Sequence, residues 1–236
     1  MAEKRRFLPV FAPRSSSAWY DLKYLCPVNL YQNKAVHLTH WLLAAGLTGA
    51  LVHPAVAQRG PGVRWPSGAV ITVWVDPDEA PADAGQLAER AMATWTHASG
   101  GAFTLAKVAD RNAAPVRVHF VTGDTTYGEA APRVDRATGR IASAEVQISG
   151  NMGGDLLTQR IVLYLTALHE LGHALGLPHT DDFNDIMYSF RRPDDGERYF
   201  GAYRRRLRGL ADIGSAAATG LSAKDLRALR ELYATP

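Results

Sequence analysis

Cysteine is almost absent from this chain of 236 residues, which contains a single one, Cys26. One cysteine forms no disulfide within the chain and supplies no thiolate cluster for a metal. Any metal site must therefore be built from histidine, aspartate or glutamate side chains.

The N-terminal part lacks an apolar run of the roughly 20 residues that cross a bilayer. The uncharged run at 41–52 (WLLAAGLTGALV) is shorter, and a small-x-small triplet ending at Ala57 follows it, which is the pattern that signal peptidase cuts. We therefore expect residues 1–57 to be an N-terminal extension with a signal peptide, cleaved after Ala57. Residues 58–236 then form an exported domain, secreted or periplasmic, without stable membrane insertion. The alternative is a buried N-terminal helix.

An excess of positive charge is missing once residues 1–57 are set aside. The whole chain carries 26 Lys and Arg against 23 Asp and Glu, and removing the first 57 residues leaves 20 basic and 21 acidic side chains. Nucleic-acid binding needs many uncompensated cations. The balance therefore argues against a nucleic-acid partner, and we expect the arginine-rich run at 203–208 to be a solvated helix face.

Hydrophobic patterning predicts one α+β domain without internal repeats. Three segments that alternate in polarity or gather β-branched residues are predicted strands: 70–75, 116–121 and 141–148. Three segments with apolar residues at helical spacing are predicted helices: 84–97, 155–175 and a last one from Ser222. Ser222 and Asp225 resemble a capping box at the start of that last helix.

The long helix carries the segment HELGHALGLPH at 169–179. Residues four apart share one helix face, so His169 and His173 present their imidazoles at a spacing that grips one zinc ion. Gly176 ends the helix by allowing a positive φ, and the chain then brings His179 to the same ion. Three neutral imidazoles leave a fourth position open, as in catalytic zinc sites. We therefore predict one catalytic Zn²⁺.

Glu170 neighbours these histidines without being a ligand. Its carboxylate is placed to hydrogen-bond a zinc-activated water and take its proton, which is the work of a general base in peptide hydrolysis. A helix that shows two histidines by chance does not explain why Gly176 and His179 also fall at the required spacing. These residues predict a zinc-dependent endopeptidase with Glu170 as its base.

At these five motif positions the chain resembles the metzincin clan of zinc endopeptidases. Met187, eight residues beyond His179, is similar to the methionine of that clan's structural Met-turn. Trp95 and the segment from Leu221 to Asp225 make the chain most similar to the matrixin (peptidase M10) family. The resemblance implies a twisted, mostly parallel sheet with an antiparallel edge strand, a long active-site helix and a C-terminal helix.

The resemblance also implies how a protein or peptide substrate binds. The substrate lies extended along an edge strand and pairs with it through the main chain. We expect this strand to be 141–148, with Ala144, Val146 and Ile148 as the substrate-binding positions.

Several positions depart from the matrixin pattern. Thr180 replaces the serine that usually follows the third histidine, and Ser189 stands where astacins and serralysins place a tyrosine ligand. The cysteine-switch propeptide is missing, because Cys26 lies in a different context and is expected to leave with the signal peptide. His97 and His119 do not match the family's structural zinc site.

Calcium is a further cofactor to weigh, because it takes oxygen ligands. Asp181, Asp182 and Asp185 offer such oxygens, but a solvated acidic loop is the favoured interpretation and no second metal is assigned. The segment 191–220 is an insertion between the Met-turn and the last helix, and neither its role nor the oligomeric state follows from the sequence.

A second function class stays open. The chain is then an exported, zinc-bearing binding protein with a metalloprotease fold but little turnover. The intact Glu170 counts against this alternative, because a protein without turnover has no chemical need for a base.

Overall fold

The computed structural model describes residues 19–21, 24–25, 62–78, 81–122, 127–150 and 153–234. The predicted apolar run at 41–52 and the cleavage position after Ala57 lie outside these residues. Within the described ranges, no helix has both the length and the apolar character to cross a membrane.

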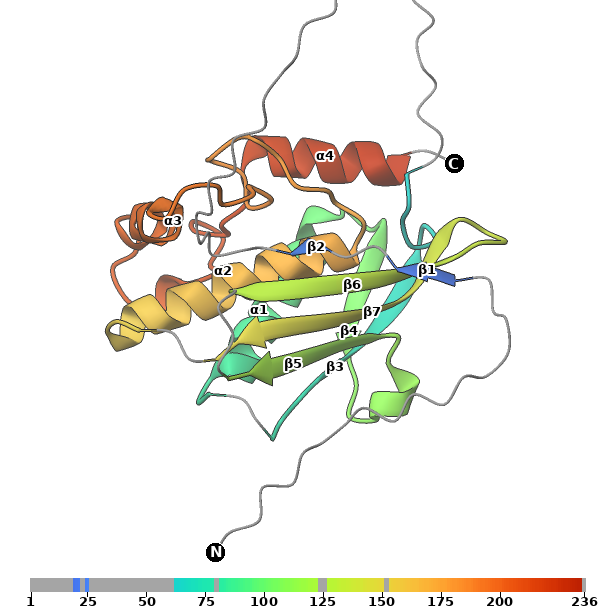
Figure 1. Ribbon diagram of the computed structural model, residues 1–236, viewed down its shortest axis with the longest axis horizontal. Helices are drawn as coiled ribbons and strands as arrows, with labels where there is room; N and C mark the ends of the chain where they lie inside the picture. The colour runs from blue at the N-terminus through green and yellow to red at the C-terminus, as the bar shows by residue number, and fades with distance from the viewer. Residues whose placement is uncertain are drawn as a thin grey trace, which may run out of the picture.

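One mixed sheet forms the centre of the fold (Figure 1). Its strands are β1 (Trp19–Asp21), β2 (Tyr24–Leu25), β3 (Ala69–Val75), β4 (Phe103–Lys107), β5 (Val116–Val121), β6 (Gly128–Asp135) and β7 (Arg140–Ser149). The spatial order is β1-β6-β7-β5-β3-β4, and β2 also pairs with β6. The strands β4, β3, β5 and β7 pair in parallel, whereas β6 is antiparallel to β7. The predicted mostly parallel sheet with an antiparallel strand is confirmed.

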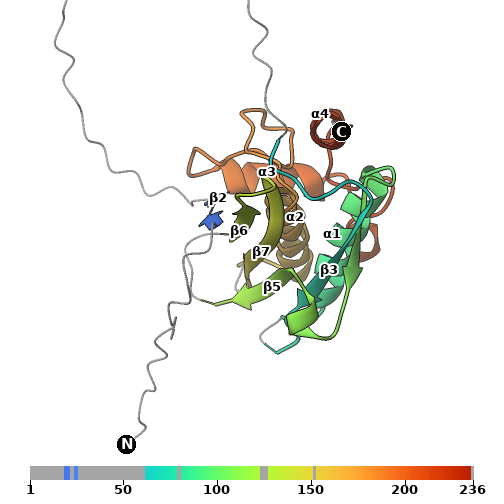
Figure 2. The same cartoon turned by 90° about the vertical axis from the view of Figure 1, so that its right-hand side faces the viewer.

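Four α-helices accompany the sheet: α1 (Ala84–Ala98), α2 (Leu156–Ala174), α3 (Asp195–Arg204) and α4 (Ala223–Ala234). The helices α1 and α2 lie together on one side of the sheet (Figure 2). The predicted helices at 84–97, at 155–175 and from Ser222 correspond to α1, α2 and α4. The elements β4, β6 and α3 were not predicted.

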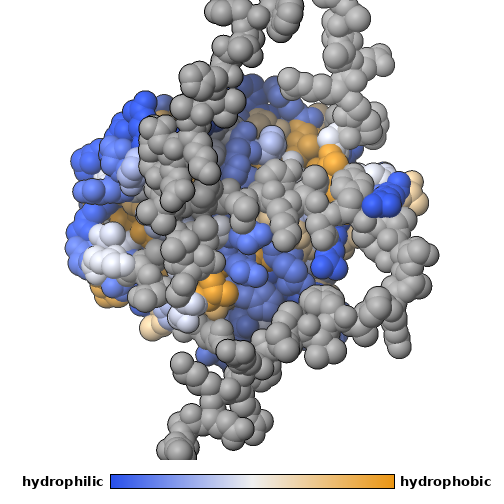
Figure 3. All heavy atoms as spheres, viewed as in Figure 1, coloured by the Kyte–Doolittle hydropathy of each residue, from blue (hydrophilic) through white to orange (hydrophobic). Residues whose placement is uncertain are grey.

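The hydrophobic core lies between the sheet and these two helices. Alternate residues of β5 show this, because Val116, Val118 and Phe120 are buried while Arg117 and His119 turn to the other face. That other face, turned to the viewer in Figure 3, is largely hydrophilic where grey atoms do not cover it. The alternation follows from the two-residue period of a strand.

The strand 141–148 is not an edge strand, so that prediction is wrong. It lies within β7, which pairs with β5 on one side and with β6 on the other. Ala144, Val146 and Ile148 are buried in the core. The outer strand of the domain at 62–234 is β6, whose second edge is paired by β1 and β2 from the N-terminal segment.

Ring donors from outside α2 hold the end of this helix that carries the histidine motif. Trp95 is fully buried on α1 and its indole donates to the carbonyl of Leu168 at 2.8 Å. The Trp65 indole donates to the Ala174 carbonyl at 2.8 Å, and the Tyr233 hydroxyl donates to Leu175 at 3.0 Å. The last carbonyls of a helix have no partner within it, so the bonds to Ala174 and Leu175 satisfy the end of α2, while the Trp95 bond ties its interior to α1.

Candidate active site

The three predicted ligands meet at one point. The Nε2 atoms of His169, His173 and His179 lie 3.1 to 3.2 Å from one another. Zinc with Zn–N distances of about 2.0 to 2.1 Å in tetrahedral geometry separates its nitrogen ligands by about 3.3 Å. The three imidazoles therefore fit one zinc ion, and within the described residues they form the only cluster of three or more metal-ligating side chains.

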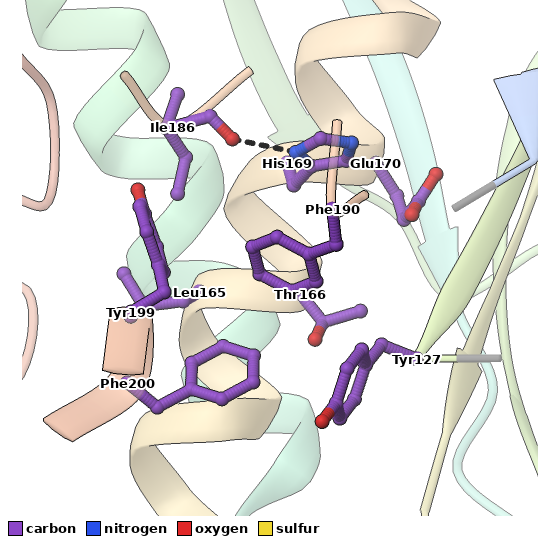
Figure 4. Close-up of a pocket in the computed structure, with 9 residues that line it drawn as sticks. All are labelled: Tyr127, Leu165, Thr166, His169, Glu170, Ile186, Phe190, Tyr199 and Phe200. Carbon is purple, nitrogen blue, oxygen red and sulfur yellow. Dashed lines mark hydrogen bonds between the residues drawn. The ribbon is translucent and has the colours of Figure 1, made fainter. Parts of the chain in front are cut away.

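Backbone carbonyls select the tautomer that metal binding needs. The Nδ1 atom of His169 donates to the carbonyl of Ile186 (Figure 4), and that of His173 donates to the carbonyl of Leu177 at 2.8 Å. A ring nitrogen that donates carries the hydrogen, so both Nε2 atoms present lone pairs. Lone pairs facing one another repel, and a cation between them removes that repulsion.

Burial keeps the ligands neutral. It lowers the pKa of His169 to about 4 and holds the pKa of His173 well below its usual range. The half-buried His179 ring also has a lowered pKa, first through burial and then through the charge of Arg191. Neutral imidazoles leave a bound ion its full charge.

Two glycines allow other segments to pack closely against the part of the chain that carries the histidines. Gly176 has φ of +100°, and a Cβ there would lie 2.1 Å from the Val63 carbonyl oxygen. Gly172 lies against Met187, whose sulfur would be 2.5 Å from a Cβ at that position. The predicted structural methionine is thus buried beneath α2. A side chain at Gly172 would push α2 away from Met187, and one at Gly176 would push the turn after α2 away from Val63.

The turn around Met187 is tied to the residue that follows the third histidine. Thr180 donates its N–H to the Met187 carbonyl at 2.8 Å and receives the N–H of Ser189. The Thr180 hydroxyl donates to Asp185 at 3.0 Å. Threonine in place of serine therefore keeps the hydroxyl contact. The backbone hydrogen bonds of Thr180 hold the neighbouring His179 beside the turn.

A buried carboxylate on α4 supports the first ligand from behind. Asp225 accepts the N–H of Ile186 at 2.9 Å, and the Ile186 carbonyl is the acceptor for His169. Asp225 also accepts the N–H of Ser222 at 2.8 Å, while the Ser222 hydroxyl accepts the N–H of Asp225. This is a reciprocal capping box. The predicted helix start thus connects α4 to the metal-binding candidate His169 through a single residue, Ile186.

Glu170 lies against β6 with its carboxylate enclosed. It is only 1% exposed, and within the described residues neither carboxylate oxygen has a hydrogen-bond partner. A Cβ at Gly128 would lie 2.8 Å from one of these oxygens, so the absence of a side chain there makes room for the carboxylate. Burial raises the pKa of Glu170 well above its usual range, and the charge of Glu129 adds to the effect. Such a group has its hydrogen-bonding capacity free for a ligand.

A small cavity opens beside His169 and Glu170 (Figure 4). Its volume is about 20 Å³. The lining residues come from α2, the segment before β6, the turn around Met187 and α3: Tyr127, Leu165, Thr166, His169, Glu170, Ile186, Phe190, Tyr199 and Phe200. Four of these are aromatic, and sequence patterns pointed to none of the four.

Of the three aspartates weighed as calcium ligands, Asp182 and Asp185 both lie 3.5 Å from the Lys224 ammonium. Asp181 pairs with Arg191, Asp182 pairs with Lys224, and the buried Asp185 accepts the hydroxyls of Thr180 and Ser222. Their roles within the described residues are local ion pairs and hydrogen bonds.

Comparison with known proteins gives the family. A family model described as Matrixin matches residues 69–199, which is more than half of the chain. This chain belongs to the matrixin family. It is accordingly placed among the zinc metalloendopeptidases, which are hydrolases of peptide bonds. The matrixin match covers the sheet from β3 to β7, the three histidines, the Met187 turn and the first half of α3.

Individual matrixin relatives match a shorter stretch. Interstitial collagenase of Bos taurus is 34% identical over 122 residues, which are 48% of this chain and 24% of that protein. Interstitial collagenase of Oryctolagus cuniculus is 33% identical over 122 residues, with 48% and 25% covered. The chain thus spans about a quarter of the length of the curated relatives that it matches.

Proposed function

We propose that the chain is an exported endopeptidase in which His169, His173 and His179 hold one zinc ion and Glu170 is the general base. The observation that carries this proposal is the enclosed Glu170 carboxylate, without a hydrogen-bond partner among the described residues, next to three converging imidazole nitrogens. Zinc supplies Lewis-acid polarisation of a carbonyl and makes water more acidic. The remaining work belongs to the side chains of the protein.

Glu170 handles the protons of the reaction. Its carboxylate accepts a proton from the attacking water and then gives that proton to the nitrogen of the departing amine. A raised pKa suits this double role, because the group must both take up and release the proton. The raised pKa of Glu170, which burial causes, supports the assignment. The positive charge of a bound zinc ion would lower that pKa again.

The substrate backbone pairs with β6 in this proposal. The strand begins at Gly128, beside Glu170, and is the outer strand of the domain. An extended peptide that adds to it forms main-chain hydrogen bonds that do not depend on sequence. In the described structure β1 and β2 pair antiparallel with this edge, with Leu25 opposite Glu129. A substrate can therefore pair with the outer edge of β6 only after the N-terminal segment has left it. Removal of residues 1–57 with the signal peptide would free this edge.

The test is proteolysis of a denatured protein mixture, with and without a zinc chelator, read by mass spectrometry of the new termini. The full chain and the chain beginning at Gln58 are compared. Denatured collagen belongs in the mixture, because the relatives are named collagenases. We expect chelator-sensitive cleavage that is faster for the shorter form.

The opposite result has a definite meaning. A folded protein that binds zinc but cuts nothing in either form supports the alternative of a zinc-bearing binding protein. Export is tested separately by the N-terminal sequence of the protein recovered outside the cytoplasm, which we expect to begin at Gln58.

A further inference from the structure

Another cavity lies against α1 and α2, and it contains two arginine side chains. Its volume is about 100 Å³, and its lining comes from the start of α1, from α2 and from the segment after α3. It shares no lining residue with the cavity beside Glu170. What this second cavity binds is therefore decided by side chains that take no part in the candidate active site.

Arg160 is the buried charge of this cavity. It lies on α2 and is only 8% exposed. Within the described residues its Nε atom has no hydrogen-bond partner, and its Nη2 atom lies 3.4 Å from the carboxylate of Asp83, a side chain that is 61% exposed. A buried guanidinium is normally paired and fully hydrogen-bonded, because removing its charge from water is costly. One long contact to a solvent-exposed carboxylate leaves this charge incompletely compensated.

A second arginine adds positive charge to the same cavity. Arg90 lies on α1 and donates to the carbonyl of Ile213 at 2.9 Å. This bond orients the guanidinium but does not cancel its charge, because a carbonyl is neutral. Asp83 is the one acidic residue of the lining, against Arg90 and Arg160. The lining therefore carries a net positive charge.

The start of α1 adds to this positive potential. Asp83 occupies the N-cap position, but its side chain makes no cap hydrogen bond, and no acidic residue lies in the first turn. An N-cap side chain reaches the helix N–H groups from an extended backbone, whereas Asp83 has φ of 67°. Its carboxylate contacts Arg160 instead. The partial positive charge of the helix N-terminus is thus left without a side-chain cap, which favours an anion nearby.

Apolar side chains complete the lining beside the arginines. Leu87 and Ile213 are buried, whereas Leu210 is 45% exposed and is one of three large apolar residues that the described structure leaves so open to water. An inorganic anion would pair with the guanidinium groups but would leave Leu210 uncovered. A carboxylate that carries an apolar chain satisfies both parts of the cavity.

We propose that this cavity is a binding site for an organic carboxylate with an apolar chain. The carboxylate pairs with Arg160 and Arg90 in competition with Asp83, and the chain lies against Leu210. The proposal is independent of the proposed function, because the cavity shares no residue with the three histidines or Glu170. A free fatty acid and the C-terminus of a peptide both present this chemistry, and the experiment distinguishes them.

The experiment is isothermal titration calorimetry of the full chain at constant ionic strength. The probes are sodium octanoate, N-acetyl-Leu-Leu with a free carboxylate, and the C-terminal amide of the same dipeptide. We expect one site per chain for octanoate or for the free dipeptide and no binding of the amide. The carboxylate that binds more tightly identifies the source of the ligand.

Two variants of the ion pair should change the affinity in opposite directions. Arg160→Gln should weaken carboxylate binding at least about tenfold, because a charge-assisted hydrogen bond is lost. Asp83→Asn should strengthen it by up to about fivefold, because the competing carboxylate is removed. If the only role of the pair were to join α1 to α2, Asp83→Asn would not strengthen binding. The aspartate variant also decides the question if Arg160→Gln does not fold, which thermal unfolding shows.

Two further variants separate the charge of the site from its apolar part. Leu210→Ser should weaken octanoate binding at least about threefold through lost apolar contact. The matched control is Arg230→Gln, which removes an exposed arginine of α4 that does not line the cavity, and its affinity should equal that of the wild type. Failure of both carboxylates to bind the wild type overturns the proposal. Unchanged octanoate affinity in a folded Arg160→Gln chain overturns it as well, because the ligand then binds elsewhere. Neither result affects the proposed function, which is tested by proteolysis.

Discussion

The metal centre and the wall of the neighbouring cavity are built in opposite ways. Two of the three metal ligands lie one helical turn apart on α2, and the third follows within a few residues. The cavity wall combines Tyr127 from before β6, Leu165 from α2, Phe190 after the Met187 turn and Phe200 from α3. The candidate metal ligands therefore lie in one short segment, whereas the cavity wall is formed by segments that only the folded chain brings together.

The largest effect is expected from Glu170→Gln, which tests the short segment that carries the histidines. The amide keeps the shape of the carboxylate but cannot act as a base, so turnover should fall by about 10²- to 10⁴-fold. Zinc content, measured by atomic emission, should stay at one ion per chain because the three histidines are untouched. Turnover close to that of the wild type would show that another group is the base.

The backbone of the same segment is tested by Gly176→Ala. Its positive φ costs a non-glycine residue about 1 to 3 kcal/mol, and the Cβ clashes with the Val63 carbonyl, which is 2.1 Å away. We expect a lower melting temperature and loss of zinc, because His179 moves with the turn. The control is Gly139→Ala, where φ is +67° but no atom lies within 4 Å of the Cβ. Equal effects in the two variants would mean that close packing at Gly176 is unimportant.

The support that the distant helix α4 gives to the metal centre is tested by Asp225→Ala. The change leaves the Ile186 N–H buried without its acceptor, which costs about 1 to 3 kcal/mol of unfolding free energy. Because Ile186 orients His169, zinc affinity should also fall about 10- to 100-fold. Ser222→Ala removes the cap hydroxyl but keeps that acceptor, so it should lower stability by about 1 kcal/mol with little change in zinc affinity. A similar loss of zinc affinity in both variants would contradict the proposed link.

The smallest effect is expected on the open face of the sheet, remote from both regions. His119 lies 3.3 Å from Asp76 through Nδ1 and 3.3 Å from Glu145 through Nε2. The Glu145 hydrogen bond raises the pKa of His119, followed by Asp76, against the opposing effects of burial and Arg111. For Glu145, burial raises the pKa, but hydrogen bonds from His119 and from Arg117 outweigh it and lower the pKa overall.

The sign of the pH dependence follows from these two directions. A raised histidine pKa stabilises the fold below the unfolded value of about 6.5, and this contribution is lost as pH rises through the folded pKa. A lowered glutamate pKa stabilises the fold above about 4.5 and is lost as pH falls. His119→Gln should therefore cost up to about 1 kcal/mol at pH 6 and less at pH 8, as measured by urea unfolding. An equal cost at both pH values would contradict the charged pairing.

The convergence of the three histidines was predictable because their spacing is local. The four-residue separation of His169 and His173, the stop at Gly176 and the position of His179 all follow from helix geometry. The capping box at Ser222 and Asp225 could be recognised in the sequence for the same reason. Its contact with Ile186, which is 39 residues away in sequence, was not.

The order of the strands and the cavity wall could not be predicted in this way. The outer strand β6 has the sequence GEAAPRVD, and glycine, alanine, glutamate and proline are all poor strand formers. The helix α3 contains two glycines, which weaken its helical pattern. The predicted edge at 141–148 was wrong because strand order depends on contacts between distant segments, and the more strand-like β7 sits inside the sheet.

The burial of Phe200 links the wall of the cavity to folding. The residue is only 8% exposed, and truncating a buried phenylalanine to alanine costs about 3 to 5 kcal/mol, out of a total stability of about 5 to 15 kcal/mol in typical proteins. Loss of this ring therefore removes a large part of the stability of a typical protein, and a chain that loses it must hold a reserve of stability beforehand. Conservative exchanges to leucine or methionine keep most of the buried apolar area and are therefore the more accessible evolutionary route to a different cavity wall.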